Sequence, residues 1–248
     1  MLVQVFCYNC YGEIVWMTSN RIGGLIYMDI IIEQGGIRLK DVDSFNPTHI
    51  FECGQAFRWK FDGEGYIGVV EDRVIRVVEE EGDIVLENVS LEDYNNMWKN
   101  YFDLDRNYSI IKGQLKSSDS IMAEAISFGY GIRILNQDPW ETLISFIISA
   151  NNNITRIGRT IDNICRVYGG SVTWRDHKYY TFPSPEVLAQ SDTKTLRKCG
   201  SGYRDRYIIE TAGMVAEDVE HFYSLVTASY DEAFNYLLKL PGVGPKVA

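Results

Sequence analysis

The chain has no run of 18 or more apolar residues, which excludes a helix that spans a membrane. Its first 27 residues carry Glu13 and Arg21 and lack a basic start before an apolar core, so they do not have the form of a secretory signal. The hydrophobic content of 46% excludes a disordered chain. We expect a folded protein without a membrane partner in the cytoplasm, associated with the nucleoid, or in the nucleus of a eukaryote.

Paired cysteines and clustered histidines are also missing. Five cysteines in 248 residues are an odd number, which argues against a disulfide framework and for a reducing compartment. Cys7 and Cys10 form a single CxxC, but a zinc site needs a second pair of ligands at suitable spacing. The three histidines are scattered singly. We predict no metal site and no required cofactor.

A surplus of positive charge is missing too. The net charge of −10 argues against a nucleic-acid partner, because phosphate binding normally uses Lys and Arg. The acidity is uneven, since residues 1–118 hold 11 Lys and Arg against 19 Asp and Glu, and residues 119–248 hold 13 against 15. In the second half, residues 197–206 carry four basic side chains opposed only by Asp205. They predict either a local positive loop or an ordinary solvated face.

The residue pattern changes from strand to helix along the chain. Alternation at 73–78 and 83–86, with turn signals near 62 and 81, predicts an antiparallel sheet with one or two helices, one of them near 91–99. From residue 117 onward helical patterns dominate. We predict an α+β fold with an antiparallel sheet domain over 28–116, an all-helical domain over 117–248 and an extension of undetermined structure over 1–27.

The clearest helix begins at Asp138, an N-cap aspartate followed by proline at the first position and glutamate at the third. Apolar residues cover nearly all its sides, so it should be buried. It ends at three asparagines, 151–153, which need partners because an unpaired buried amide costs about 1–3 kcal/mol. They either fasten the turn or face a ligand groove. A second amphipathic helix follows, with Arg156 off its apolar face.

The last nine residues, 240–248 (LPGVGPKVA), carry the most specific pattern. A Ser-x-x-Glu capping box at 229–232 starts a helix, and Gly242 and Gly244 end it in a hairpin whose N–H groups can hold a phosphate oxygen. A proline then suits the first position of the next helix and puts Lys246 in its first turn. The pattern predicts a helix-hairpin-helix with an amine, and a surface turn with a solvated lysine is the alternative.

Several segments together resemble one family, the 8-oxoguanine DNA glycosylases of the eukaryotic type, within the helix-hairpin-helix glycosylase superfamily. Each alone is weak, but their order along the chain makes the combination specific. They are GQAFRW at 54–59, YFDLD at 101–105, QDP at 137–139, NNNITR at 151–156, LRKCGSGYR at 196–204 and LPGVGPK at 240–246. The resemblance covers the chain from about residue 36 to its end.

The resemblance implies base-excision repair by a glycosylase with AP lyase activity that removes 8-oxoguanine opposite cytosine from double-stranded DNA. Such an enzyme takes the damaged nucleotide out of the duplex. Lys246 would attack the sugar, expel the base and leave a Schiff base, from which strand cleavage follows. Gly242, Val243 and Gly244 would hold a DNA phosphate, and a monovalent cation could bind there. The protein is expected to be a monomer.

The resemblance also assigns the DNA contacts. Gly54 would recognise the lesion, because guanine presents N7 as an acceptor whereas 8-oxoguanine carries a hydrogen there for a backbone carbonyl. Asn151 would occupy the space left by the flipped base. Arg156 and Arg204 would contact the orphaned cytosine, and Tyr203 would wedge the opened stack.

One implied residue is not reached by the sequence. The family needs a carboxylate after the lysine helix to stabilise charge on the sugar, and the sequence stops at Ala248. We therefore expect a C-terminally truncated chain that could be inactive alone, and we do not assign the missing role to Asp119 or Asp138. A non-catalytic DNA-binding fragment and a glycosylase for another damaged base stay open, although Lys246 argues against an enzyme that uses water.

Overall fold

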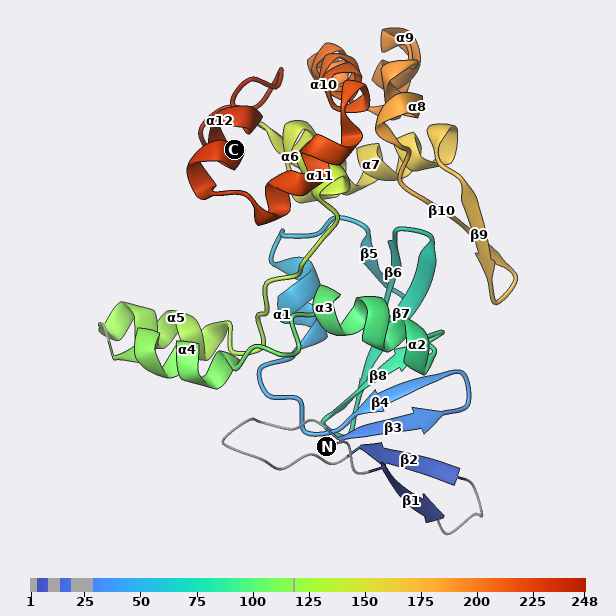
Figure 1. Ribbon diagram of the computed structural model, residues 1–248, viewed down its shortest axis with the longest axis vertical. Coiled ribbons are helices and arrows are strands. Elements are labelled where there is room, and N and C mark those ends of the chain that lie inside the picture. The colour runs from blue at the N-terminus through green and yellow to red at the C-terminus, as the bar shows by residue number, and fades with distance from the viewer. Residues whose placement is uncertain (1–3, 9–13, 19–28, 118) are drawn as a thin grey trace. The chain divides into compact units, whose positions relative to one another are not determined.

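The computed structural model describes residues 4–8, 14–18, 29–117 and 119–248 (Figure 1). The chain divides into two compact units. Met1–Gly68 and Val74–Asn136 form the sheet unit, and Val69–Arg73 and Gln137–Ala248 form the helical unit. The predicted extension over 1–27 lies outside the described residues apart from two short strands, and so does Cys10 of the CxxC pair.

The sheet unit contains a six-stranded antiparallel sheet in the order β3-β4-β8-β7-β6-β5, and β1 and β2 form a separate pair. The strands are β1 (Gln4–Tyr8), β2 (Ile14–Thr18), β3 (Ile30–Glu33), β4 (Gly36–Leu39), β5 (Trp59–Phe61), β6 (Tyr66–Val70), β7 (Arg73–Glu80) and β8 (Asp83–Glu87). The predicted turn between β7 and β8 is confirmed. Glu81 and Gly82 both have positive φ, at 52° and 88°, as a two-residue hairpin turn requires.

The sheet unit also contains several helices, and α1, η1 and α3 contribute to an aromatic core. The helices are α1 (Pro47–Glu52), α2 (Leu91–Asp93), η1 (Tyr94–Trp98), α3 (Lys99–Tyr101), α4 (Tyr108–Lys116) and α5 (Ser120–Phe128). The helix predicted near 91–99 is confirmed as the run α2-η1-α3, whose central part is a wider π-helical turn. Phe51 stacks on Trp59 at 3.9 Å between ring centroids, and Trp98 stacks on Phe102 at 5.9 Å. These rings connect α1 and η1 to the sheet unit's core.

Two arginines of the sheet unit, Arg76 and Arg38, are held by carboxylates. Arg76 is 8% exposed in its side chain and contacts Asp62 at 2.7 Å, Glu64 at 2.9 Å and Glu87 at 3.2 Å. Hydrogen bonding from the Arg76 guanidinium lowers the pKa of Asp62 to about 2. Arg38 is bound in the same way by a second set of acidic side chains.

The helical unit is built around α6, and the contacts among its helices place α7, α10 and α11 against it (Figure 1). Its elements are α6 (Pro139–Ser149), α7 (Ile154–Tyr168), β9 (Ser171–Trp174), β10 (His177–Tyr180), α8 (Pro185–Ala189), α9 (Thr193–Cys199), η2 (Gly202–Arg204), α10 (Asp205–Glu217), α11 (Val219–Ser224), η3 (Leu225–Thr227) and α12 (Tyr230–Leu237). The predicted cap and burial of α6 are confirmed, since Asp138 accepts the N–H of Glu141 at 2.7 Å and most of α6 is buried. The β9-β10 hairpin is an addition that the helical pattern did not indicate.

The described residues include neither a membrane-spanning helix nor a metal-binding cluster. No helix there has both the length and the apolar character needed to cross a bilayer. No group of three or more His, Cys, Asp or Glu side chains there could hold a metal ion.

Candidate active site

The three asparagines after α6, residues 151–153, differ in their contacts. The amide of Asn152 donates to the carbonyl of Ile148 at 3.1 Å, and the side chain of Asn153 caps α7 by accepting the N–H of Arg156 at 3.0 Å. Asn151 has a φ of 49° and is exposed. Two asparagines therefore fasten the turn, and the third is left accessible to a ligand in the left-handed conformation that asparagine tolerates.

Arg204 fastens the same turn from the other side. It is 5% exposed, and its Nε donates to the carbonyl of Ala150 at 3.1 Å while one Nη donates to the carbonyl of Asn151 at 3.2 Å. Its guanidinium carbon lies 4.5 Å from the ring centroid of Tyr203. The structure thus brings Asn151, Tyr203 and Arg204 together, with Arg204 buried beneath the asparagine turn.

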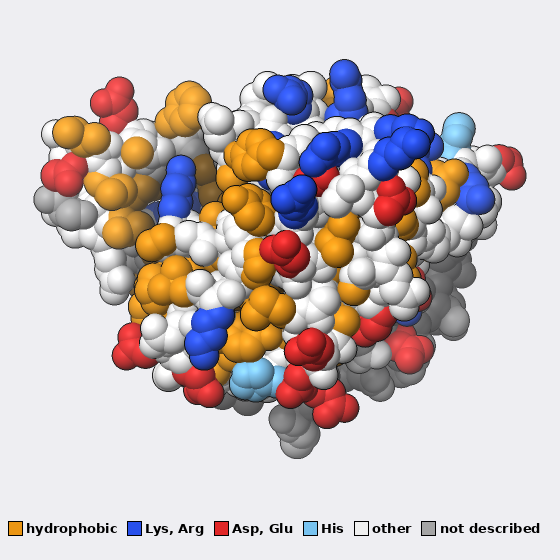
Figure 2. Space-filling view, turned by 90° about the horizontal axis from the view of Figure 1, so that it is seen from above, with side chains coloured by type: hydrophobic (Ala, Val, Ile, Leu, Met, Phe, Trp, Pro, Cys, Tyr) orange, Lys and Arg blue, Asp and Glu red, His pale blue; other side chains and the backbone are white. Residues whose placement is uncertain are grey.

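The basic stretch at 197–206 is only partly the positive loop that its sequence suggests. Arg204 is buried as described, and Arg197 pairs with the fully buried Asp205 at 2.6 Å. Lys198 and Arg206 are exposed, as is Arg156 at the start of α7. The view from above in Figure 2 shows Lys and Arg side chains gathered over part of one face with few acidic side chains among them. The local surface is therefore more basic than the net charge indicates.

Tyr203 is connected to the C-terminal hairpin through Tyr207. The rings of Tyr203 and Tyr207 meet edge to face at 6.4 Å, and Tyr203 is 59% exposed. Gly242 has a φ of +81°, and a Cβ added there would lie 2.9 Å from the Cβ of Tyr207. Only glycine therefore fits at the point where the hairpin packs on α10.

The hairpin is further fixed by its own backbone and by Thr211. The hydroxyl of Thr211 donates to the carbonyl of Pro241 at 2.9 Å, and the N–H of Val243 donates to the carbonyl of Leu240 at 3.1 Å. In the described part of the chain, the N–H groups of Gly242 and Gly244 meet no backbone acceptor. Of the three predicted phosphate donors, Val243 thus closes the hairpin, and the two glycines keep their N–H groups for a ligand.

Lys246 follows the hairpin in the predicted position. The N–H groups of Val247 and Ala248 both donate to the carbonyl of Gly244, at 2.9 and 3.0 Å, so a helical turn begins there. The side chain of Lys246 is exposed, and no carboxylate of the described residues forms an ion pair with it. The amine is accessible to a ligand held by the hairpin.

Gly54 belongs to the sheet unit, whereas the residues above belong to the helical unit. It follows α1, is half-buried and has a φ of +86°. The next residue, Gln55, makes several side-chain hydrogen bonds to backbone groups. Sequence reasoning missed Gln55, Tyr207 and Thr211. Only Tyr207 had a signal in the sequence. It follows Tyr203 by four positions, and residues at this spacing share one face of a helix.

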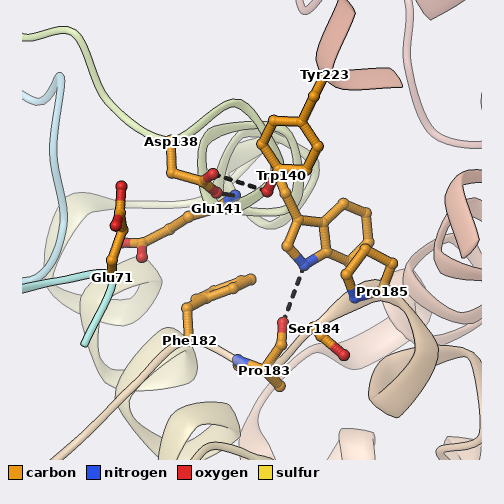
Figure 3. Close-up of a pocket in the computed structure, with 9 residues that line it drawn as sticks. All are labelled: Glu71, Asp138, Trp140, Glu141, Phe182, Pro183, Ser184, Pro185 and Tyr223. Carbon is orange, nitrogen blue, oxygen red and sulfur yellow. Dashed lines mark hydrogen bonds between the residues drawn. The ribbon is translucent and has the colours of Figure 1, made fainter. Parts of the chain in front are cut away.

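A cavity of about 210 Å³ in the helical unit lies apart from these residues (Figure 3). Asp138 accepts the hydroxyl of Tyr223 at 2.8 Å in addition to capping α6, and the indole of Trp140 donates to the carbonyl of Pro183 at 2.9 Å. Burial and the charge of Asp138 raise the pKa of Tyr223. No predicted site residue lines this cavity, and Asp138 acts as the structural cap that the sequence predicts.

Two family models match adjoining parts of the chain. Residues 37–143 match the N-terminal domain of 8-oxoguanine DNA glycosylase. Residues 144–244 match the HhH-GPD superfamily of base excision DNA repair proteins.

Individual relatives agree with these matches. The chain is 35% identical over 228 residues to an N-glycosylase/DNA lyase of Saccharomyces cerevisiae, covering 81% of this chain and 60% of that protein. It is similar to the solved 8-oxoguanine glycosylase/lyase of Clostridium acetobutylicum in its apo form, with 35% identity, a TM-score of 0.83 and coverage of 90% of this chain and 78% of that one. The same enzyme with double-stranded DNA containing cytosine opposite 8-oxoguanine matches at 34% identity and a TM-score of 0.84, covering 90% and 76%. The chain spans 51% to 60% of the length of the curated N-glycosylase/DNA lyases that it matches.

Proposed function

Because this chain belongs to the 8-oxoguanine DNA glycosylase family of helix-hairpin-helix base-excision repair proteins, we propose that it removes 8-oxoguanine opposite cytosine and cleaves the resulting abasic site. The observation that carries the proposal is the position of Lys246. It presents an exposed amine in the turn that follows a hairpin fixed to α10 by Gly242 and Thr211. A phosphate bound by the hairpin brings the DNA backbone to that amine.

The proposed chemistry begins with the neutral amine of Lys246. Its lone pair forms a bond to the anomeric carbon of the sugar, and the electrons of the glycosidic bond leave with the oxidised base, which takes up a proton. Opening of the sugar then gives a Schiff base. Loss of a proton from the adjacent carbon expels the 3′ phosphate by β-elimination, and water releases the lysine.

The asparagine turn and its neighbours are the proposed contacts to the opened duplex. Asn151 and Tyr203 are exposed, and the buried Arg204 contacts the carbonyl of the first and the ring of the second. In the proposal Asn151 fills the vacated space, Tyr203 wedges the stack and Arg156 contacts the orphaned cytosine. The same contact by Arg204 requires one of its donors to leave the carbonyl of Ala150 or Asn151.

The proposed partner is double-stranded DNA, bound by a monomer in the cytoplasm and nucleoid or in the nucleus. Backbone N–H groups of Gly242 and Gly244 hold the phosphate without any side-chain charge. The exposed Lys198 and Arg206 add local positive charge. Together these features support DNA binding by a protein whose net charge is −10.

Borohydride trapping tests the role of Lys246. With a duplex that carries an abasic site opposite cytosine, the 248-residue chain should give a reduced covalent adduct, because an aldehyde and an amine suffice for a Schiff base. Lys246→Gln should abolish the adduct, whereas Lys239→Gln, an exposed lysine just before the hairpin, should retain it. Loss of the adduct in both variants or in neither would overturn the assignment. Release of 8-oxoguanine from a lesion duplex, measured in parallel, tests the substrate.

A further inference from the structure

Gly54 begins a loop, residues 54–58, that joins α1 to β5 without regular secondary structure. In the role that the family resemblance implies for Gly54, its carbonyl accepts the one hydrogen that distinguishes the oxidised base from guanine. A hydrogen bond weakens steeply when its angle departs far from linear. The direction of this carbonyl therefore needs support that neither a helix nor a strand ladder provides.

The side chain of Gln55 supplies that support. Its Nε2 donates to the carbonyls of Ile50 at 2.9 Å and Arg133 at 2.8 Å, and its Oε1 accepts the N–H of Leu135 at 3.0 Å. The last two partners are 78 and 80 residues away in the sequence. By donating to residue 133 and accepting from residue 135, the amide pairs with that segment as the backbone of a neighbouring strand does.

The segment bound by Gln55 is itself fixed by a buried cation. Arg133 is 4% exposed, and its guanidinium donates to the carbonyls of Asp103 at 2.7 Å and Asp43 at 2.9 Å. The guanidinium carbon also lies 4.5 Å from the ring centroid of Tyr108. Because these contacts hold Arg133 within the unit, the amide of Gln55 is attached to a rigid part of it.

We propose that Gln55 is a positioning residue for lesion recognition. The carbonyl of Gly54 and the N–H of Gln55 belong to one planar peptide unit, so fixing Gln55 limits the directions that the carbonyl can take. Gln55 acts through Gly54 and makes no DNA contact in this inference. The inference rests on the proposed function, removal of 8-oxoguanine, and on the lesion contact that the family resemblance implies for the carbonyl of Gly54.

The test measures DNA affinity in a Lys246→Gln background, which leaves the DNA uncleaved. Three duplexes are compared, with 8-oxoguanine, guanine or a tetrahydrofuran abasic analogue opposite cytosine. Gln55→Met keeps the side-chain length and removes the amide. The matched control is Asn136→Leu, since the amide of Asn136 lies on the same segment but donates to the carbonyl of Asn100 at 2.8 Å.

Gln55→Met should lower the ratio of lesion to guanine affinity by about tenfold, the value of one lost hydrogen bond, and change binding to the abasic analogue by less than about twofold. Asn136→Leu should change neither quantity. An unchanged ratio in folded Gln55→Met, or an equal loss with all three duplexes, would overturn the positioning role.

A second variant keeps the test decisive if Gln55→Met does not fold. Gln55→Glu retains the length and the acceptor for Leu135 but loses the donors to Ile50 and Arg133, and it should also lower the ratio. The Lys246→Gln protein with Gln55 unchanged distinguishes failure of the proposed function from failure of the positioning role. If it shows no preference for the lesion, the proposed function fails and the inference fails with it. If it prefers the lesion and both Gln55 variants do as well, the inference alone fails.

Discussion

The sheet unit and the helical unit differ in how several of their cationic side chains are paired. In the sheet unit, Arg76 and Arg38 are each surrounded by carboxylates. In the helical unit, Lys198, Arg206 and Lys246 are exposed and form no ion pair within the described residues. The charge that a ligand meets therefore depends on the unit it approaches, and the net charge of the whole chain does not report it.

Arg204 of the helical unit and Arg76 of the sheet unit are both buried, but they have different partners. Arg204 donates to backbone carbonyls of the asparagine turn, whereas Arg76 donates to three carboxylates. One guanidinium thus fixes a loop that we assign to DNA contact, and the other fixes a sheet. Arg133 of the sheet unit also donates to backbone carbonyls, so the partners of a buried arginine differ from site to site and not only between the units.

The largest effect that the comparison predicts is on stability. Arg76→Met should lower the free energy of unfolding by about 3 kcal/mol, because Asp62 and Glu87 are partly buried and would lose their shared cation. Urea unfolding measures this. Arg73→Met is the matched control on the same strand, since its 45% exposed side chain pairs with the exposed Asp72 and should cost less than about 1 kcal/mol. Similar losses of unfolding free energy in both variants would contradict a special role for the carboxylates around Arg76.

The next prediction concerns DNA binding without any change of charge. Gly242→Ala forces an alanine into a φ of +81° and its Cβ against Tyr207, so the hairpin should shift and duplex affinity should fall by about tenfold. Fluorescence anisotropy with a labelled duplex measures the affinity. Gly244→Ala meets nothing within 4 Å and should leave the melting temperature unchanged, whereas Gly242→Ala should lower it. If Gly242→Ala changed neither duplex affinity nor the melting temperature, the hairpin would not hold the DNA phosphate as proposed.

The smallest prediction concerns salt dependence. Lys198→Gln and Arg206→Gln should each reduce the slope of log affinity against log salt by about 0.9, the value for one phosphate contact. A titration of duplex binding from low to high salt measures the slope. Arg73→Gln, which removes a cation of β7 that pairs with Asp72, should leave it unchanged. An equal change in all three variants would contradict the distinction between Lys198 and Arg206, which are unpaired within the described residues, and a cation that is paired with a carboxylate.

Local signals were enough to predict where α6 and α12 begin. The caps at Asp138 and Ser229 depend on bonds to an N–H three residues later, and the structure contains both. The hairpin and the turn that places Lys246 are local as well. Such features can be predicted because the interacting groups are neighbours in the sequence.

Long-range contacts could not be predicted in this way. The guanidinium of Arg204 reaches carbonyls 53 and 54 residues earlier in the chain, and nothing near residue 204 marks it as buried. The amide of Gln55 binds partners 78 and 80 residues later. The family resemblance gave the roles proposed for Asn151 and Gly54, which stay predictions, but not the side chains that hold them. Tertiary packing decides which polar groups such residues meet.

Helix α10 determines where the C-terminal hairpin is held. Tyr207 and Thr211 lie one turn apart on it and both contact the hairpin, while Tyr203 lies one turn before Tyr207. A helix advances about 1.5 Å and rotates about 100° per residue. The positions of Tyr207 and Thr211 along α10 therefore determine where the hairpin packs on this helix. A residue inserted between Tyr207 and Thr211 would therefore rotate one of these two contacts away from the hairpin.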